Sequence, residues 1–350
     1  MQRYVLPNSH EALLRNSHLL TGRLALLGAS SSSLLAELPS GGMVMSEHAG
    51  HAHAMSDYAS WQVCFGYDDP GLKPAGFDTV VVFLPKARAE LDLRLALARW
   101  LSAPEATLIL LGEKKEGIAG AVKQFKAIAP EATKIDSARH CQVWRATGIE
   151  PLTSFDLEAW MGWHRIECAG VSVDVAGLPG IFSQGELDGG TEALLETFVQ
   201  TPLKADRVLD FACGAGVIGA WLQSWQRERE GGHATVDGVD VQSQAVICAR
   251  ATYERAAAAG TIIASDGLAE IEGSWPAIVT NPPFHSGVKT DISMTENFLR
   301  DVSRHLESRG ELRLVANSFL PYETLIKRFI GPVERLYEDR RFCVYRAVRR

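Results

Sequence analysis

The chain has 350 residues, of which 46% are hydrophobic and 22% are charged, and it carries a formal net charge of −7. At roughly 100 to 200 residues per domain, this length predicts two domains with separate cores, and the composition excludes extended disorder and a small disulfide-stapled scaffold. No apolar stretch approaches the ~20 residues of a membrane helix and the amino terminus lacks the layout of a signal peptide, so we expect a cytoplasmic protein with no membrane partner.

The distribution of charges and the cysteines narrow the class further. Residues 300–350 contain twelve Lys or Arg and seven Asp or Glu, a net charge of +5, which leaves −12 for the rest of the chain. This segment could form a basic face for nucleic acid or an ordinary solvated surface. The six cysteines show no C-x-x-C pair and are expected to be reduced, mostly buried thiols, so neither a disulfide framework nor a metal site is indicated.

Two segments of the first half have counterparts in the second half at a nearly constant distance. Phe77–Pro85 is similar to Trp275–Pro283 at an offset of 198 residues, and Gln142–Ala146 is similar to Cys343–Ala347 at an offset of 201. A tandem duplication of one fold leaves such a pattern, although two unrelated α/β domains could coincide in this way. We therefore expect two tandem doubly wound, Rossmann-like α/β domains. The predicted domains are residues 1–155 and 156–350.

The two halves differ where ligand chemistry would lie. The second half has Asp210–Gly216 where the first has Gly28–Ser32, with a single glycine and no acid. The second half also has Asn281–Phe284 where the first has Leu84–Ala87. The first domain is therefore expected to be degenerate, because it keeps the fold and has lost the site.

The second half alternates predicted strands and helices after a short hairpin over Arg165–Phe182 that turns at Ala169-Gly170. This alternation implies right-handed crossovers and a mostly parallel sheet, which binds ligands at the carboxyl ends of its strands. The predicted strands are Arg207–Phe211, Thr235–Val239, Thr261–Ala264, Ala277–Thr280, Glu311–Ala316, Val333–Tyr337 and Phe342–Val348. The predicted helices begin after Gly216 and cover Gln244–Ala258, Glu296–Leu306 and Tyr322–Phe329.

The first predicted strand of this half runs into a glycine turn and then a helix. Gly214 and Gly216 have no side chains, so the backbone can turn sharply and a ligand can lie against it beside the positive end of the helix. The spacing of these glycines and Gly219, with Asp240 twenty-one residues further on, also matches the dinucleotide fingerprint. The turn alone therefore does not decide between cofactors.

Three acids at successive strand ends favour one cofactor. Asp210, just ahead of the turn, would repel a pyrophosphate but attract the ammonium group of S-adenosylmethionine, which has a cationic sulfonium and no phosphate. Asp240 can accept hydrogen bonds from both ribose hydroxyls, and Asp266 from the adenine amino group. A single acid of this kind is usually a helix cap or lies in a solvated loop, but three together indicate a site. The predicted cofactor-binding residues are Asp210, Ala212, Cys213, Gly214, Gly216, Asp240, Val241, Asp266, Gly267 and Asn281.

Asn281-Pro282-Pro283-Phe284 follows the fourth strand and is the predicted catalytic motif. An exocyclic amino group on a base is a poor nucleophile because its lone pair is delocalised into the ring. The Asn281 side-chain oxygen and the Pro282 carbonyl can accept its two protons and localise that pair, while Phe284 stacks on the base. Transfer would then be direct and driven by orientation. The alternative for the motif alone is an ordinary Asn-Pro turn.

These motifs together resemble the ribosomal small subunit methyltransferase C family, and the similarity covers nearly the whole chain. Asn-Pro-Pro-Phe is shared by many amino-group methyltransferases, whereas the long run near the carboxyl terminus is much more specific. Ala212 stands where the family pattern usually has the first glycine of the turn. Its methyl group could narrow the site, or the backbone there does not need a positive φ, and we expect weaker cofactor binding at most. The resemblance rests on Lys134–Arg139, Leu178–Ser183, Leu187-Asp188, Asp210–Gly219, Asn281–Gly287, Gly310–Tyr322 and Arg341–Ala347.

The resemblance implies a duplicated methyltransferase whose second copy transfers a methyl group from S-adenosylmethionine to the exocyclic N2 amino group of one guanine in 16S ribosomal RNA. It implies that the first copy supports folding and RNA binding, and that the assembled small ribosomal subunit is the substrate. The residues by themselves leave a large-subunit guanine, a protein glutamine, a DNA adenine, a non-catalytic RNA chaperone and an NAD-dependent dehydrogenase open. The sequence does not indicate a specific oligomer, and we expect a monomer.

Overall fold

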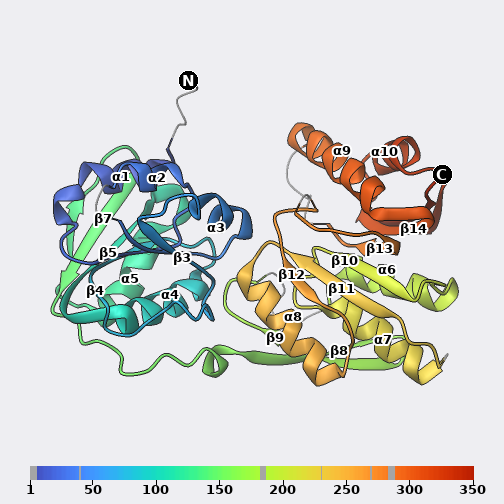
Figure 1. The fold of residues 1–350 in the computed structure, drawn as a ribbon, viewed down its shortest axis with the longest axis horizontal. Helices are drawn as coiled ribbons and strands as arrows, with labels where there is room; N and C mark the ends of the chain where they lie inside the picture. Colours follow the sequence, from blue (N-terminus) through green and yellow to red (C-terminus); the bar gives the residue numbers. More distant parts are fainter. Residues whose placement is uncertain (1–5, 39–40, 182–186, 230, 269, 283–287) are drawn as a thin grey trace. The chain divides into compact units, whose positions relative to one another are not determined.

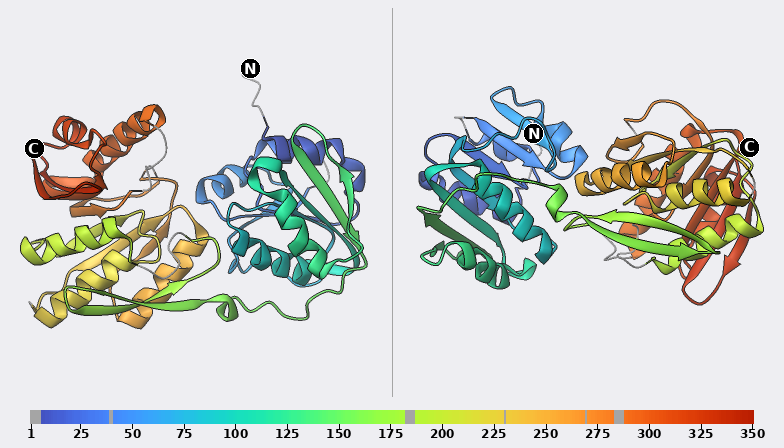
Figure 2. Two further views of the ribbon diagram at one scale, coloured as in Figure 1. Left: turned by 180° about the vertical axis from the view of Figure 1, so that it is seen from behind. Right: turned by 90° about the horizontal axis from the view of Figure 1, so that it is seen from below.

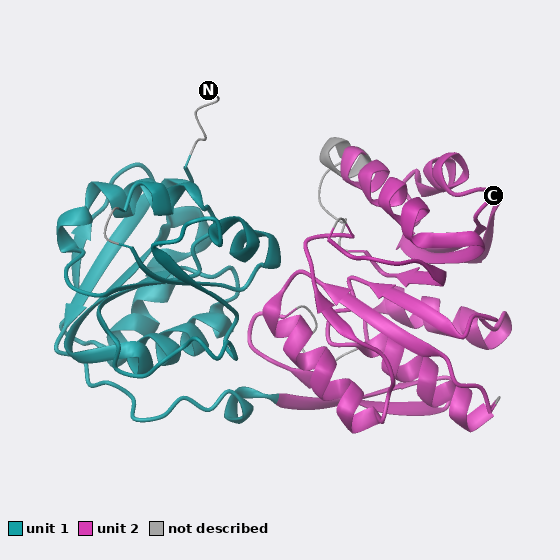
Figure 3. Cartoon of the chain, viewed as in Figure 1, with its two compact units in different colours: residues 1–161 teal, residues 162–350 magenta. Residues whose placement is uncertain are grey.

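The protein consists of two compact units, residues 1–161 and 162–350 (Figure 3). The computed structural model describes residues 6–38, 41–181, 187–229, 231–268, 270–282 and 288–350. Each unit contains one seven-stranded sheet with helices packed against it (Figure 1), which confirms the predicted pair of α/β domains.

The first unit is built around the strand order β3-β2-β1-β4-β5-β7-β6. All pairs are parallel except those made by β7, which is antiparallel to both of its neighbours. The strands are β1 (Leu24–Leu27), β2 (Gly42–Ser46), β3 (Trp61–Phe65), β4 (Phe77–Phe83), β5 (Ser102–Glu113), β6 (Thr133–Asp136) and β7 (Cys141–Thr147). The α-helices are α1 (Asn8–Arg15), α2 (Ser33–Ala36), α3 (Ala49–Met55), α4 (Arg88–Leu101) and α5 (Ile118–Ile128). Short 3-10 turns are η1 (Ser17–Leu19), η2 (Lys114–Glu116) and η3 (Glu158–Trp160).

The second unit repeats this topology with the order β12-β11-β10-β13-β14-β16-β15, after a separate hairpin formed by β8 and β9. Here β16 is the antiparallel strand. The strands are β8 (Gly162–Cys168), β9 (Val171–Gly177), β10 (Arg207–Phe211), β11 (Thr235–Asp240), β12 (Ile262–Ala264), β13 (Trp275–Thr280), β14 (Leu306–Asn317), β15 (Val333–Glu338) and β16 (Phe342–Val348). The helices are α6 (Gly189–Gln200), α7 (Val217–Arg229), α8 (Ser243–Ala256), α9 (Val288–His305) and α10 (Tyr322–Phe329).

Every strand and helix predicted for the second half is present. The largest difference is at α9, which begins at Val288 rather than Glu296, although Val288 and Ile292 already follow a helical spacing of apolar residues. The strands β10 and β13 are mostly apolar and are buried on both faces, as parallel strands covered by helices must be, with Asp210 as a buried acid in β10.

The matching strand orders support the duplication, and the strand pairing gives its alignment. Leu24 pairs with Thr79 in the first unit, and Val208 pairs with Ala277 in the second. Combined with the offset of 198 residues between β4 and β13, this pairing places Phe83, rather than Leu84, at the position of Asn281. The helices differ more than the strands: α2 has 4 residues and α3 has 7, whereas their counterparts α7 and α8 have 13 and 14.

The hairpin β8–β9 packs against α7 and α8 within the second unit (Figure 2). Its turn is at the predicted position, since Ala169 and Gly170 have φ values of 50° and 76°, as a two-residue hairpin turn of type I′ requires. The indole N–H of Trp221 donates to the carbonyl of Cys168 at 3.1 Å, and the N–H of Ala176 donates to Thr252 Oγ1 at 3.0 Å. The hairpin thereby fixes the helices that follow the glycine turn.

All six cysteines are buried and unpaired, which confirms the prediction of structural thiols. Among the described residues, no helix combines the length and apolar character that crossing a membrane requires.

Candidate cofactor and catalytic site

The predicted site residues converge because four neighbouring strands end at one edge of the second sheet. Phe211 of β10 pairs with Val239 of β11 on one side and with Thr280 of β13 on the other. Asp240 pairs with Ala264 at the end of β12. The glycine turn, the residues after each of these strands and Asn281 therefore share one edge, as predicted.

The backbone of the glycine turn takes left-handed conformations at three positions. The φ values are 57° at Ala212, 53° at Gly214 and 80° at Gly216. A Cβ atom placed on Gly214 would meet nothing within 4 Å, so this glycine faces open space in which a ligand can lie. A Cβ on Gly216 would lie 3.1 Å from Tyr253 and 3.2 Å from Ala249, so this glycine is needed for close packing against α8.

The conformation of Ala212 decides between the two expectations for this position. Its φ of 57° shows that the turn does require the left-handed region, so the expectation of an ordinary φ is wrong. The alanine packs against the apolar cluster that contains Leu209 and Phe211. Ala212 therefore carries local strain, because a Cβ atom in this region crowds the following carbonyl oxygen.

Replacing Ala212 with glycine is expected to stabilise the second unit. Relief of roughly 1 to 2 kcal/mol of left-handed strain exceeds the about 0.4 to 1 kcal/mol of added chain entropy in the unfolded state, which leaves a gain of about 0.5 to 1 kcal/mol. Urea denaturation of the purified variant measures it. Ala215→Gly is the matched control, since Ala215 lies in the same turn without a positive φ and its replacement should destabilise the unit. Equal effects of the two changes would contradict the strain at Ala212.

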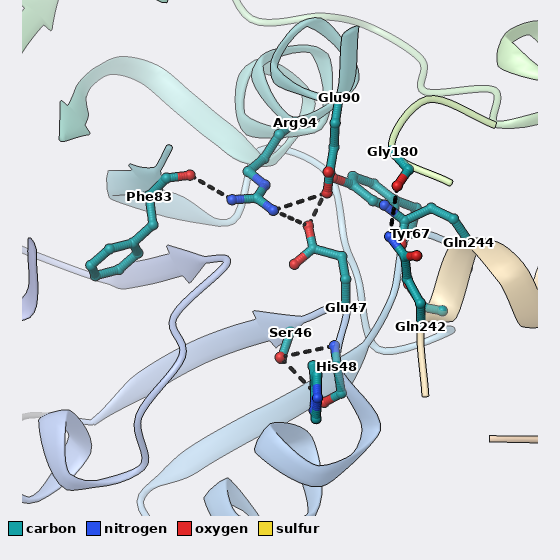
Figure 4. A network of polar contacts seen from close by, with 11 residues as sticks. Ser46, Glu47, His48, Tyr67, Phe83, Glu90, Arg94, Gly180, Gln242 and Gln244 are labelled. Atoms are coloured by element: carbon teal, nitrogen blue, oxygen red, sulfur yellow. Dashed lines mark hydrogen bonds and ion pairs between the residues drawn. The ribbon is translucent and has the colours of Figure 1, made fainter. Parts of the chain in front are cut away.

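Asp240 connects the end of β11 to the turn. Its Oδ2 accepts the N–H of Gly214 at 2.9 Å, and its Oδ1 accepts the N–H of Gln242 at 3.0 Å. Burial raises the pKa of Asp240, and these two donors together with the N–H of Val241 offset part of the rise. Gln242 in turn donates from Nε2 to the carbonyl of Gly180 at 3.0 Å (Figure 4), so the segment after β11 is tied to the loop after the hairpin.

Asp210 is fully buried at the end of β10. Neither of its carboxyl oxygens makes a hydrogen bond of normal geometry to the residues that the structure describes. Burial, followed by the charge of Asp240, raises the pKa of Asp210 well above its usual range, and the N–H of Gly219 offsets only part of this rise. A buried acid without partners is uncommon, and a cation beside it would stabilise its charged form.

The other predicted cofactor residues lie at the same edge with different exposure. Cys213 is buried against Gly238, and burial raises the pKa of its thiol well above the usual range, so it stays neutral. Val241 is half-buried and Asp266 is exposed. Gly267 has a φ of 76°, and a Cβ placed on it would meet nothing within 4 Å, so its side also faces open space.

Asn281 is held by residues that the sequence motifs did not identify as functional. Its Nδ2 donates to Asp188 Oδ2 at 2.8 Å and to Thr191 Oγ1 at 3.0 Å. Asp188 is also the N-cap of α6, where its Oδ2 accepts the N–H of Thr191 at 3.0 Å. These bonds use both amide protons and leave Oδ1 as the end of the amide that can accept protons from a ligand. The Asp-Gly-Gly-Thr pattern ahead of an apolar run is a helix-start signal that marks Asp188 in the sequence.

The rest of the catalytic motif is described only in part. Pro282 is buried directly after Asn281. Phe284, the predicted stacking residue, lies outside the described residues.

These observations fit a cationic ligand without phosphate. The glycine turn offers an open face at Gly214, and the charged forms of the acids on both sides of it, Asp210 and Asp240, would be destabilised by a pyrophosphate and stabilised by a cation. An ammonium or sulfonium group would instead compensate the unpartnered carboxyl of Asp210. The residues present therefore fit S-adenosylmethionine better than a dinucleotide.

In the first unit, the side chain of Arg94 occupies the position that corresponds to the cofactor site of the second unit, and Figure 4 shows its polar contacts. Arg94 of α4 donates to the carbonyl of Phe83 at the end of β4, and it forms ion pairs with Glu47 at 2.7 Å and Glu90 at 3.0 Å. A Cβ atom on Gly28, which follows β1, would lie 2.1 Å from Arg94 Nη1. The guanidinium thus lies against the backbone that corresponds to the glycine turn of the second unit.

The charge of this arginine is balanced inside the first unit. Tyr67 donates its hydroxyl to Glu47 Oε1 at 2.8 Å. Burial lowers the pKa of Arg94, but Glu47, together with Tyr67 and Glu90, outweighs burial and raises it overall. The network keeps the guanidinium charged and leaves no room for a ligand against Gly28, so the predicted loss of the first site has a structural basis.

The comparisons with known proteins cover almost the whole chain. Residues 10–164 match the family Methyltransferase small domain N-terminal, and residues 172–346 match Methyltransferase small domain. A ribosomal RNA small subunit methyltransferase C from Hahella chejuensis is 39% identical over 355 residues, which cover 98% of this chain and 99% of that protein. The protein of the same name from Pseudomonas fluorescens is 39% identical over 343 residues, with coverages of 97% and 98%.

A solved structure supports the fold. The T. thermophilus 16S rRNA N2 G1207 methyltransferase, in complex with AdoMet and guanosine, superposes with a TM-score of 0.83 at 23% identity, covering 99% of this chain and 93% of that one. The sequence similarity over almost the whole chain shows that it belongs to the ribosomal RNA small subunit methyltransferase C family.

Proposed function

We propose that this protein transfers a methyl group from S-adenosylmethionine to the exocyclic N2 amino group of a guanine in 16S ribosomal RNA. The observation that carries the proposal is the orientation of Asn281, whose Nδ2 protons are bound by Asp188 and Thr191, so that Oδ1 is the atom of the amide that can accept from the substrate. Family membership supports the RNA substrate, and the solved relative named for N2 of G1207 supports that nucleotide as the target.

The cofactor would lie across the glycine turn. We assign its amino-acid end to the neighbourhood of Asp210, its ribose to Asp240 and its adenine to Asp266 and Gly267. S-adenosylmethionine supplies, when bound, an electrophilic methyl group on a sulfonium sulfur. The role of the protein is to place and orient the cofactor. Asp240 stabilises the conformation of the turn by accepting the N–H of Gly214.

The amino group of the base would be activated by two acceptors. Asn281 Oδ1 and the carbonyl of Pro282 each hold one amino proton, which turns the nitrogen lone pair out of conjugation with the ring. The carboxyl of Asp188, bonded to Nδ2, polarises the amide and strengthens Oδ1 as an acceptor. No nucleophile of the protein is required, and the buried, neutral thiol of Cys213 agrees with direct transfer.

We assign RNA binding and support of folding, rather than cofactor binding, to the first unit. In this unit, Arg94 occupies the position that corresponds to the cofactor site of the second unit. On another part of this unit, Lys126 and Lys134 place their ammonium groups 5.3 and 5.9 Å from the centre of the Trp144 ring. Two lysines on an aromatic side chain form a surface suited to a nucleic-acid backbone and an unpaired base.

We also infer that the protein acts in the cytoplasm, where ribosomal subunits are assembled, and that it acts as a monomer. All residues assigned to the reaction come from the second unit of one chain, which supports the monomer. The alternatives are a guanine of the large subunit and a glutamine side chain of a protein, because both present an amino group conjugated to a carbonyl or ring.

Labelled S-adenosylmethionine distinguishes these substrates. Small subunits, large subunits, naked 16S RNA and release factors, all from cells that lack this protein, are incubated with it in separate reactions. We expect label in a single guanosine of the small subunit, at the position named G1207 in the solved relative. Label only in protein, or only in large subunits, would overturn the assignment.

A further inference from the structure

Phe319 is the most exposed of the large hydrophobic side chains on the described surface, with 75% of its area in contact with water. It follows the carboxyl end of β14, the strand that pairs with β13 beside the catalytic edge. An isolated exposed hydrophobic residue is common on protein surfaces and by itself indicates nothing. The surroundings of Phe319 give it significance.

The turn that carries Phe319 is attached to the loop that precedes β16. The N–H of Ser318 donates to the carbonyl of Arg341 at 2.9 Å, and Ser318 Oγ donates to the carbonyl of Asp339 at 2.8 Å. The N–H of Leu320 donates to the carbonyl of Asn317 at 3.0 Å and closes the turn. Phe319 and Arg341 thus lie on two loops that are joined to each other by hydrogen bonds.

A short series of contacts joins Arg341 to the catalytic amide. Its guanidinium lies over the ring of Phe342, 4.9 Å from the ring centre. The ring of Phe342 packs on Gly190, where an added Cβ would lie 3.2 Å from it. The same Cβ would lie 3.4 Å from Asn281 Nδ2. Gly190 therefore adjoins both the ring that supports Arg341 and the amide of Asn281.

The charge of Arg341 is available to an external anion. Arg335 and Arg346 of the adjoining strands form ion pairs with glutamates, whereas Arg341 forms none with the residues that the structure describes. Asp339 is the carboxylate nearest in sequence. Its Oδ1 accepts the N–H groups of Arg341 and Phe342, and its Oδ2 accepts the hydroxyl of Tyr337.

We propose that Phe319 and Arg341 bind the nucleotide next to the target guanine, with Phe319 stacking on its base and Arg341 contacting its phosphate. This inference rests on the proposed RNA substrate. A guanine that is extruded from a helical stack leaves the face of its neighbour without a partner, and an exposed aromatic ring beside the catalytic edge restores the stacking. A guanidinium at the same edge fixes the position of the backbone without reading sequence.

Steady-state methylation of small subunits by four variants tests this site. Phe319→Ala is expected to raise KM roughly 10- to 100-fold, as the loss of one stacked base does, with kcat changed less and affinity for S-adenosylmethionine unchanged. Phe319→Trp should recover most of the parental KM. Arg341→Gln should raise KM and lower the slope of log KM against log salt by about 0.7, as the loss of one phosphate contact does on single-stranded RNA. Val199→Ala, a change at another exposed hydrophobic residue, should leave all values at those of the parent.

The outcomes separate this inference from the proposed function. If the parent protein methylates small subunits and Phe319→Ala keeps its KM within twofold, the proposed function stands and this site is wrong. An equal loss in Phe319→Ala and Phe319→Trp, or an unchanged salt slope in Arg341→Gln, likewise overturns it. If the parent does not methylate RNA, both proposals fail.

Discussion

Replacing Asn281 with alanine is expected to lower the rate of methyl transfer roughly 10²- to 10³-fold, while RNA binding and cofactor binding stay close to those of the parent. The change removes the Oδ1 acceptor but leaves the glycine turn and the acids in place. Loss of one preorganised polar group at a reacting centre typically has this cost. Single-turnover methylation of small subunits, together with calorimetric titration of S-adenosylmethionine, measures the two effects separately.

A change at Asp188 provides the companion test of this mechanism. Asp188→Ala keeps Asn281 but removes one of the two acceptors of its Nδ2 protons, so that Thr191 Oγ1 alone holds the orientation of the amide. We expect kcat to fall about 10-fold or more with little change in KM, because Asp188 positions Asn281 and does not touch the substrate. Unaltered turnover in Asn281→Ala would contradict the proposed mechanism. Unaltered kcat in Asp188→Ala would contradict only the role of Asp188 in positioning Asn281.

Replacing Arg94 with alanine is expected to destabilise the first unit by about 3 to 5 kcal/mol. The guanidinium is buried and balances the charges of Glu47 and Glu90, so its removal leaves two buried carboxyl groups without the cation that compensates them. It also leaves an empty space against Gly28. Hydrogen exchange of the β1 and β2 amides reports on this unit separately from the second one.

Two controls define the cause of that loss. Arg88→Ala removes an exposed arginine from the first position of the same helix and should change stability by no more than about 0.5 kcal/mol. The double variant Arg94→Met with Glu47→Gln should recover part of the lost stability. It removes one of the two buried carboxyl groups, and the methionine side chain fills much of the space that the guanidinium occupied. If the amide hydrogens of β1 and β2 exchanged at the same rates in Arg94→Ala as in the parent, the ion pairs of Arg94 would not be what stabilises the first unit.

The sequence predicted most of the second unit because its signals are local. Apolar runs of strand length, such as Ala277–Thr280, and the glycine turn at 214–216 depend on near neighbours, and the structure has both at the predicted positions. The start of α9 was missed although Val288 and Ile292 follow a helical spacing of apolar residues. The predicted alignment of Leu84 with Asn281 was wrong by one residue, although the offset of 198 residues between Phe77–Pro85 and Trp275–Pro283 already aligns Phe83 with Asn281, as the strand pairing does.

The sequence by itself determined the duplicated α/β fold, the glycine turn, the acids after successive strands and the Asn-Pro-Pro-Phe motif, since each is a short-range pattern of residue types. Tertiary structure decided what holds these residues and what they face. It brought Asp188 to Asn281 from 93 residues away, required Ala212 to take a positive φ, and placed Arg94 against Gly28. These facts depend on which strands and helices become neighbours, and burial and hydrogen bonding between distant segments leave no periodic signal in a single chain.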